Sequence, residues 1–219
     1  MPRPAVLFDL DGTLVVFPEP WIREARREFI DWLRSEFSRD LELWNGIDEL
    51  SIPQIIELVA GGNAERYRLL RGVVERIYSE KELGAAEHAA PRSSVPDLLE
   101  ELRRRGISMA VTTNNSRTAA NLSLKRAGID EYFSCVVSRN DVDRMKPDPE
   151  MLVKASYALG APFSMAIHVG DSPVDILAAR SVGMMAVSLT GGVSSREKLL
   201  AHRPHLLIDS PIELLSLFP

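Results

Sequence analysis

From residue 91 onward, short apolar runs alternate with helical segments, and this alternation limits the possible folds more than any other feature of the chain. Each of the four longest predicted helices in this region is followed by a glycine, which is a common way for a helix to end. Strands joined by helices of this length need crossover connections, so they form a parallel sheet with helices on both faces. The pattern predicts strands at 107–113, 134–138, 165–169 and 184–189, helices at 97–105, 117–127, 149–159 and 173–182, and short elements at 206–209 and 212–217.

The segment before residue 91 has a different periodicity. Ala5–Phe8 is a short, continuous apolar run, typical of a buried central strand. In the residues that follow, apolar side chains recur every three or four positions and charged side chains fill the gaps, which is typical of amphipathic helices. The pattern predicts helices at 21–38, 53–60 and 64–83.

The chain therefore divides into a predicted core domain of residues 1–14 and 91–219 and a helical insert of residues 15–90. The predicted fold is α/β, with a doubly wound parallel sheet in three layers and an α-helical domain inserted after the first strand. Between residues 15 and 90 there are ten basic and fifteen acidic residues, so the insert accounts for the whole formal charge of −5. A formally neutral core and an acidic insert argue against a nucleic-acid-binding protein.

Composition narrows the class of protein further. With 45% hydrophobic and 26% charged residues, the chain of 219 residues has the composition of a folded globular protein. Its single cysteine, Cys135, cannot form an internal disulfide, which favours a reducing compartment. The apolar run near the start has four residues, fewer than the ~7–15 of a signal peptide or the ~18 of a membrane span. We therefore expect a soluble, cytoplasmic monomer or homodimer without nucleic-acid or membrane partners.

Polar residues follow four of the predicted strands, where an open parallel sheet binds its ligands. Carboxylates crowded at this edge would repel one another without a cation between them, and hard oxygen ligands select Mg²⁺. A lysine beside main-chain amides at helix starts suits a phosphate group. The four clusters are Asp9-Leu10-Asp11-Gly12-Thr13, Thr113-Asn114-Asn115-Ser116, Lys146-Pro147-Asp148-Pro149 and Gly170-Asp171-Ser172-Pro173-Val174-Asp175.

Each cluster also has a purely structural interpretation. An Asp-Gly pair after a strand is commonly a turn, Thr113-Asn114 suits a strand end or a helix cap, and Lys146-Pro147 suits a surface turn. Asp175 suits the first turn of a helix, where an acidic side chain is favourable. The site is absent only if all of these structural interpretations are correct at the same time. Because that combination is improbable, the sequence favours a functional site. His168, inside an apolar strand, is interpreted as a core residue.

Taken in order, the four clusters resemble the motifs of the haloacid dehalogenase (HAD) superfamily. Within it, the chain resembles the phosphoglycolate phosphatase-like branch, in which a helical C1-type cap is inserted after the first motif. The resemblance covers nearly the whole chain, although residues 15–90 match only in position and helical character. It implies a Rossmann-like HAD core and a Mg²⁺-dependent phosphatase that hydrolyses a small phosphate monoester through an aspartyl-phosphate intermediate.

The resemblance implies a role for each residue at a matching position. Asp9 is the nucleophile, and Asp11 is the general acid and base. Asp9, the main-chain carbonyl of Asp11 and Asp171 bind Mg²⁺. The remaining motif residues bind the phosphate (Thr113, Asn114 and Lys146) or support the residues in contact with metal and substrate (Thr13 and Asp175).

Other activities of the same superfamily are separated by particular residues. A dehalogenase lacks the second acid of the first motif, so the presence of Asp11 disfavours it. A phosphonate hydrolase uses a cap lysine, and the only lysine in the insert is Lys81, near its far end. A sugar phosphomutase shares all four motifs and stays an alternative. A catalytically silent binding protein is a further alternative, disfavoured by the presence of Asp9 and Lys146.

Substrate choice is expected to lie in the cap, because the core motifs contact only the phosphate. The turn at Gly61-Gly62-Asn63, with nearby Arg66, is the candidate for the substrate-facing loop. A glycine pair is also an ordinary break between two helices. Gly62, Asn63 and Arg66 are therefore predicted substrate contacts with a structural alternative, and the sequence does not identify the substrate.

Overall fold

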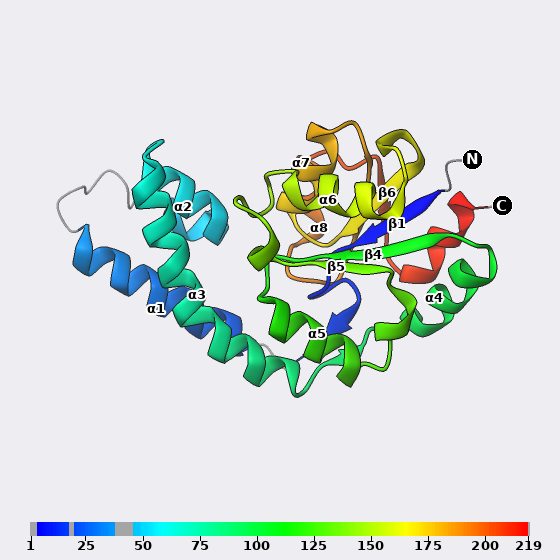
Figure 1. Ribbon diagram of the computed structural model, residues 1–219, viewed down its shortest axis with the longest axis horizontal. Coiled ribbons are helices and arrows are strands. Elements are labelled where there is room, and N and C mark those ends of the chain that lie inside the picture. Colours follow the sequence, from blue (N-terminus) through cyan, green and yellow to red (C-terminus); the bar gives the residue numbers. More distant parts are fainter. Residues whose placement is uncertain (1–3, 18–19, 38–45, 219) are drawn as a thin grey trace. The chain divides into compact units, whose positions relative to one another are not determined.

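The computed structural model describes residues 4–17, 20–37 and 46–218 (Figure 1). The chain forms two compact units, a core unit (Met1–Phe17 with Ala86–Pro219) and a helical unit (Pro18–Ala85). The helical unit is shorter at both ends than the predicted insert. The reason is a two-stranded antiparallel ribbon, β2 (Val15–Val16) and β3 (Ala90–Pro91), which pairs the outgoing chain with the returning chain and belongs to the core unit.

The core unit contains a six-stranded sheet in the order β5-β4-β1-β6-β7-β8, and every pair of neighbours is parallel. This order confirms the predicted doubly wound α/β fold. The chain moves outward from β1 in one direction and then crosses back to continue in the other. The strands are β1 (Ala5–Phe8), β4 (Ser108–Thr112), β5 (Cys135–Val137), β6 (Ala166–Gly170), β7 (Met185–Leu189) and β8 (Leu206–Ile208).

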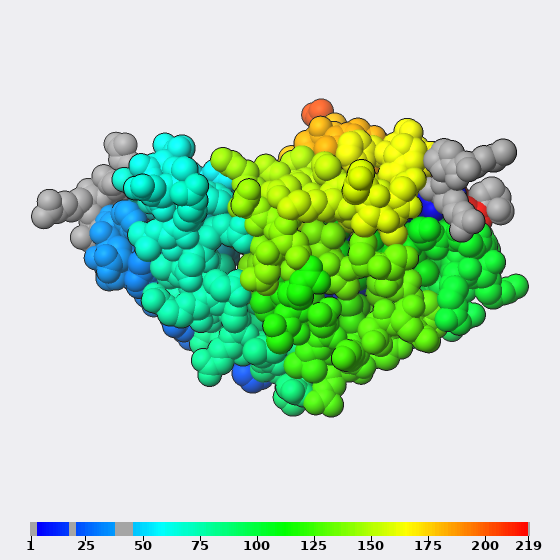
Figure 2. Space-filling model, viewed as in Figure 1, coloured from blue at the N-terminus to red at the C-terminus, as the bar shows by residue number. Residues whose placement is uncertain are grey.

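Helices cover both faces of the sheet, α4 and α5 on one side and α6 and α7 on the other (Figure 1). In the space-filling view, green, yellow and orange segments form most of the visible surface of the core unit (Figure 2). Helix α8 was not predicted, because a helix of six residues is too short to give a periodic signal. The helices are α4 (Val95–Arg104), α5 (Arg117–Arg126), α6 (Glu150–Leu159), α7 (Pro173–Ser181) and α8 (Arg196–Ala201), with 3-10 turns at Asp130–Tyr132, Arg139–Asp141, Phe163–Met165 and Pro211–Leu217.

Strand β1 lies at the centre of the sheet and is almost completely buried, as its apolar sequence predicts. Ala5, Val6 and Leu7 are 0% exposed. In the register of the sheet, Phe8 lies opposite Val111 of β4 and Val169 of β6. The residues that follow these three strands therefore leave the sheet at nearly the same level, which places the motif residues at one edge.

The helical unit consists of α1 (Pro20–Glu36), α2 (Ile52–Ala60) and α3 (Ala64–Ala86), with a 3-10 turn at Ile47–Glu49. These helices confirm the predicted amphipathic segments, although the predicted end of the first one, residue 38, lies outside the described residues. On α1, Ala25, Phe29 and Leu33 are buried at four-residue spacing, as expected of one apolar helix face. Within the part of the chain that the structure covers, no helix is both long and apolar enough to cross a membrane.

Candidate active site

Three motif residues lie directly beyond the carboxyl ends of neighbouring strands. Asp9 follows β1, Thr113 follows β4 and Asp171 follows β6. Main-chain hydrogen bonds continue one residue past the strands, from Asp9 N to Val169 O (2.8 Å) and from Thr113 N to Val137 O (2.9 Å). The backbone that carries these side chains is thus fixed by the sheet itself, a rigid support for a catalytic site.

Lys146 is the centre of a buried network, although it comes from a loop. The residue is 1% exposed, and its main chain joins the following proline through a cis peptide bond. Its Nζ donates hydrogen bonds to three acceptors: Asp9 Oδ1 (2.7 Å), Asp175 Oδ1 (2.7 Å) and the main-chain oxygen of Thr112 (2.8 Å). Since an ammonium group has three N–H donors, this geometry uses all of them. Lys146 therefore holds the predicted nucleophile in place and is not a surface turn residue.

The side chain of Asn114 is bonded to the loop that carries Lys146. Its Oδ1 accepts a hydrogen bond from Lys146 N (3.0 Å), and its Nδ2 donates to Lys146 O (3.1 Å). Both ends of the amide are thus bonded to the main chain of the lysine loop. Asn114 thus fixes the loop that delivers Lys146 to the site, and its contact with phosphate stays a prediction.

The charges of this network shift the pKa values of its members in opposite directions. Burial raises the pKa of Asp9, and the nearby charge of Lys146 only partly opposes that effect. Burial alone would also raise the pKa of Asp175, but the Lys146 charge and the hydrogen bond from His168 bring it below its ordinary value. Although burial acts to lower the pKa of Lys146, the carboxylates of Asp175 and Asp9 raise it overall. The lysine is therefore positively charged at neutral pH.

Asp171 is a buried residue whose carboxylate lies close to the backbone of two glycines. It is 1% exposed, and its Oδ2 accepts a hydrogen bond from Val193 N (2.6 Å). A Cβ atom on Gly12 or on Gly192 would lie 2.2 or 2.0 Å from this oxygen, so neither position has room for a side chain. Gly12 also has a φ of +78°, which favours glycine on its own. The contribution of the loop at Gly192 and Val193 was missed, because a glycine pair after a strand carries no specific signal.

The carboxylates of this site fit a divalent cation. Ligand oxygens of Asp9, Asp171 and Asp175 lie within 4.8 Å of one another. Burial, together with the charges of Asp9 and Asp175, raises the pKa of Asp171 well above its ordinary value, an effect that a bound cation would offset. Both oxygens of Asp175 already accept hydrogen bonds, from Lys146, His168 and Ser172. This leaves Asp9 and Asp171 as the side chains best placed to hold a metal, and an all-oxygen donor set favours Mg²⁺.

The loop after β1 is held by its own main chain. Gly12 N donates to Val15 O (2.8 Å), and Leu14 N donates to Leu10 O (2.8 Å). Thr13 was predicted to support the loop by hydrogen bonding, but among the described residues its Oγ1 has no partner. The reason is that Thr13 lines a small, mostly apolar cavity beneath the loop.

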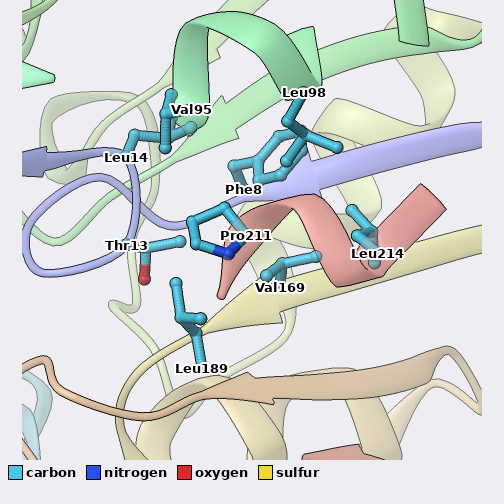
Figure 3. A pocket seen from close by; sticks show the side chains of 9 residues that line it. All are labelled: Phe8, Thr13, Leu14, Val95, Leu98, Val169, Leu189, Pro211 and Leu214. Carbon is cyan, nitrogen blue, oxygen red and sulfur yellow. The ribbon is translucent and has the colours of Figure 1, made fainter. Parts of the chain in front are cut away.

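This cavity has a volume of about 10 Å³, enough for a single water molecule and far too small for a phosphate ester. It is therefore a packing gap under the loop and not the substrate site. Figure 3 shows the nine side chains that line it: Phe8, Thr13, Leu14, Val95, Leu98, Val169, Leu189, Pro211 and Leu214.

Three further residues contact the predicted site residues, although the sequence predicted no role in the site for any of them. His168, predicted to be a core residue, is 1% exposed and lies 3.1 Å from both Leu7 O and Asp175 Oδ1 through its two ring nitrogens. Arg92 donates through Nη1 to Gly12 O (2.5 Å). Asn115 donates through Nδ2 to Asp11 Oδ2 (2.6 Å). Asn115 belongs to the second polar cluster, but nothing in the sequence indicated its contact with Asp11, and His168 and Arg92 resemble ordinary core and loop residues.

The predicted cap residues have partners within the helical unit. Asn63 Oδ1 accepts a hydrogen bond from Arg66 N (2.9 Å), so Asn63 caps the start of α3. The Arg66 side chain donates to Val59 O (3.3 Å) and lies 6.0 Å from the centre of the Phe37 ring. Gly62 has a φ of +80°, which suits the turn between α2 and α3. These contacts give Asn63 and Arg66 a structural role in joining the two helices.

Comparison with known proteins agrees with this fold and identifies the family. Residues 4–183 match the family model described as haloacid dehalogenase-like hydrolase. Pyrophosphatase PpaX of Bacillus velezensis is 29% identical over 215 residues, which cover 97% of this chain and 95% of that protein.

Solved structures of similar fold cover almost the whole chain as well. A hydrolase from Pseudomonas syringae superposes with a TM-score of 0.71 at 22% identity, covering 98% of this chain and 97% of that one. A predicted phosphoglycolate phosphatase from Haemophilus somnus 129PT superposes with a TM-score of 0.66 at 24% identity, covering 99% of this chain and 98% of that one. At these identities the structures establish the fold alone.

The family match spans most of the chain and includes all four motif clusters, so this chain belongs to the haloacid dehalogenase-like hydrolases. The resemblance stated from the motifs and the assignment to a hydrolase are thereby confirmed.

Proposed function

We propose that this protein is a Mg²⁺-dependent phosphatase that hydrolyses a small phosphate monoester through an aspartyl-phosphate on Asp9. The observation that carries the proposal is the buried network in which Lys146 joins Asp9 to Asp175 (2.7 Å each), beside the buried carboxylate of Asp171. A lysine and a divalent cation on either side of one carboxylate let an anionic nucleophile approach an anionic phosphate. The names of the PpaX and phosphoglycolate phosphatase relatives support the same chemistry.

In the first step, a carboxylate oxygen of Asp9 attacks phosphorus, and the bond between phosphorus and the leaving oxygen breaks. Asp11 gives its proton to the departing alcohol. Lys146 holds Asp9 Oδ1 through this step, which leaves the other oxygen for attack. Asp9 is also the most exposed partner in this network, since its side chain is 13% exposed against 3% for Asp175.

In the second step, water attacks the phosphorus of the aspartyl-phosphate, and Asp11 accepts a proton from that water. The bond between Asp9 and phosphorus breaks, which returns Asp9 to the carboxylate form and releases inorganic phosphate. Asp9, Asp171 and the main-chain carbonyl of Asp11 would hold a divalent cation, which would supply positive charge to the phosphoryl oxygens. Thr113, at the end of β4, is proposed to contact the same oxygens.

The substrate is a small phosphate ester, and inorganic pyrophosphate is a second candidate because of the PpaX-named relatives. A panel of 2-phosphoglycolate, sugar phosphates, nucleotides, p-nitrophenyl phosphate and pyrophosphate, assayed with Mg²⁺, tests the proposal. We expect wild type to release phosphate and Asp9→Asn to lose that activity. Asp97→Asn, an exposed aspartate at the start of α4, is the matched control and is expected to behave as wild type.

Absence of phosphate release by wild type across this panel would contradict the proposal. A sugar phosphomutase is separated by following the phosphoryl group of a hexose 1-phosphate. Isomer formation without net release of phosphate would favour the mutase, whereas stoichiometric phosphate release supports hydrolysis. Cytoplasmic location and a monomeric or dimeric state are proposed on the sequence alone.

A further inference from the structure

The side chain of Asn115 reaches the second acid of the first motif across a long stretch of sequence. Its Nδ2 donates a hydrogen bond of 2.6 Å to Asp11 Oδ2, and 104 residues separate the two. This contact links the loop after β4 to the loop after β1. It is made by a residue to which neither the motifs nor the family comparison assigns a function.

The main chain of Asn115 is itself held at both of its polar groups. Its N–H donates to Thr113 Oγ1 (3.1 Å), and its carbonyl accepts a hydrogen bond from Arg139 N (3.1 Å). Arg139 is 2% exposed, and its guanidinium also donates to the carbonyl of Asn114 (3.2 Å). A buried arginine thus fixes the backbone of both asparagines, and the amide of Asn115 is presented from a rigid support.

The two neighbouring asparagines serve different partners. Asn114 uses its amide to hold the main chain of Lys146, which acts on the nucleophile Asp9. Asn115 directs its amide to Asp11, the residue that moves the protons. Asn114 thus positions the group that acts in phosphoryl transfer, and Asn115 positions the group that acts in proton transfer. Kinetic measurements can therefore distinguish the two residues.

We propose that Asn115 is a positioning residue for the acid–base chemistry proposed for Asp11, and that it holds the Asp11 carboxylate in the orientation that reaches the leaving oxygen. An amide N–H is a donor only, so it orients the carboxylate without taking the proton that Asp11 transfers. Without this bond the Asp11 carboxylate loses a donor that orients it, and proton transfer slows. The proposal rests on the phosphatase function proposed above.

The test compares two leaving groups in a single turnover with enzyme in excess and Mg²⁺ present. An alkyl phosphate needs a proton on its leaving oxygen, whereas p-nitrophenyl phosphate releases a stable phenolate that needs none. We expect Asn115→Ala to slow release of the alkyl alcohol by about 10- to 100-fold and release of p-nitrophenolate by less than about threefold. The concentration for half-maximal rate should stay as in wild type, because Asn115 acts through Asp11.

Three variants complete the experiment. Asn115→Asp keeps the shape of the side chain but removes the N–H, so it should slow the alkyl ester at least as much as Asn115→Ala. Asp11→Asn gives the reference pattern for loss of proton transfer. Asn140→Ala removes another asparagine side chain that binds a main-chain N–H outside the site (Arg117 N, 2.9 Å), and it should react as wild type with both esters.

The outcomes separate this inference from the phosphatase proposal. If wild type releases phosphate from no member of the substrate panel, the proposed function fails and the role of Asn115 fails with it. If wild type cleaves both, equal slowing of the two esters by Asn115→Ala, with a rise in the half-maximal concentration, would make Asn115 a substrate contact and overturn the positioning role. Full activity of Asn115→Asp on the alkyl ester would also overturn it.

Discussion

The core unit and the turn between α2 and α3 use polar side chains in contrasting ways. In the core, Lys146 bonds to Asp9 and Asn115 bonds to Asp11 across 137 and 104 residues of sequence. At the turn of the helical unit, Asn63 bonds to Arg66 only three residues away. Polar residues that converge from distant segments form a chemical site, whereas polar residues that bond locally end and begin helices. This contrast favours the core as the source of the chemistry and gives the turn a structural role.

The largest effect is expected from removing the central cation of the core. Lys146→Met keeps the length of the side chain but leaves Asp9 and Asp175 buried without their shared partner. Breaking a buried ion pair costs about 3–5 kcal/mol of stability, and loss of the charge should lower phosphatase activity at least about 100-fold. Chemical denaturation and phosphate release at saturating Mg²⁺ measure the two effects. Activity within tenfold of wild type would show that the network does not carry the chemistry.

Asp171 makes stability depend on pH in a defined direction. Folding raises the pKa of Asp171, so above about pH 4 the folded protein keeps a proton that the unfolded chain has lost. As pH rises further, this difference lowers the free energy of unfolding. Asp171→Asn should therefore gain about 1–3 kcal/mol relative to metal-free wild type at pH 7, with a smaller gain near pH 4. Denaturation curves at the two pH values measure this difference. An equal gain in stability at the two pH values, or a loss of stability at pH 7, would contradict a raised pKa for Asp171.

The same carboxylate should make wild type respond to metal. A 100-fold excess of Mg²⁺ over its dissociation constant stabilises a protein by about 2.7 kcal/mol, and wild type should gain this at pH 7. Asp171→Asn should gain almost nothing, because one of the two best-placed ligands is lost. Thermal unfolding with and without Mg²⁺ provides the measurement. An equal gain for the two proteins would place the cation elsewhere.

The smallest effect is expected at the turn of the helical unit. Asn63→Ala removes the cap of α3 and should cost about 1 kcal/mol of stability. If the side chain only caps the helix, kcat/KM for the best substrate of the panel should change by less than about twofold. A large rise in KM with unchanged stability would instead show that Asn63 contacts substrate, as the sequence analysis predicted.

The fold and the core motifs were predictable from the sequence because both follow from short-range patterns. Apolar runs such as Ala5–Phe8 identify buried strands, and residues that follow parallel strands must meet at one edge. The roles of Asn114, Asn115 and His168 were not predictable, since each depends on a contact with a residue far away in the chain. The hydrogen bond predicted for Thr13 is not made by its hydroxyl for a related reason. Packing beneath the loop determines whether the hydroxyl has a partner, and no motif encodes that packing.

The central claim is that Asp9 becomes phosphorylated while Asp11 serves proton transfer, and trapping the phosphoryl group on the protein tests it most directly. Asp11→Asn keeps an oxygen that can accept the hydrogen bond from Asn115. Mixed with p-nitrophenyl phosphate and Mg²⁺, this variant should release one equivalent of p-nitrophenolate quickly and then stall, because no base activates the water. Peptide mapping after acid quench should find one added phosphoryl group on Asp9. Continuous release of phosphate with no label on Asp9 would contradict the account.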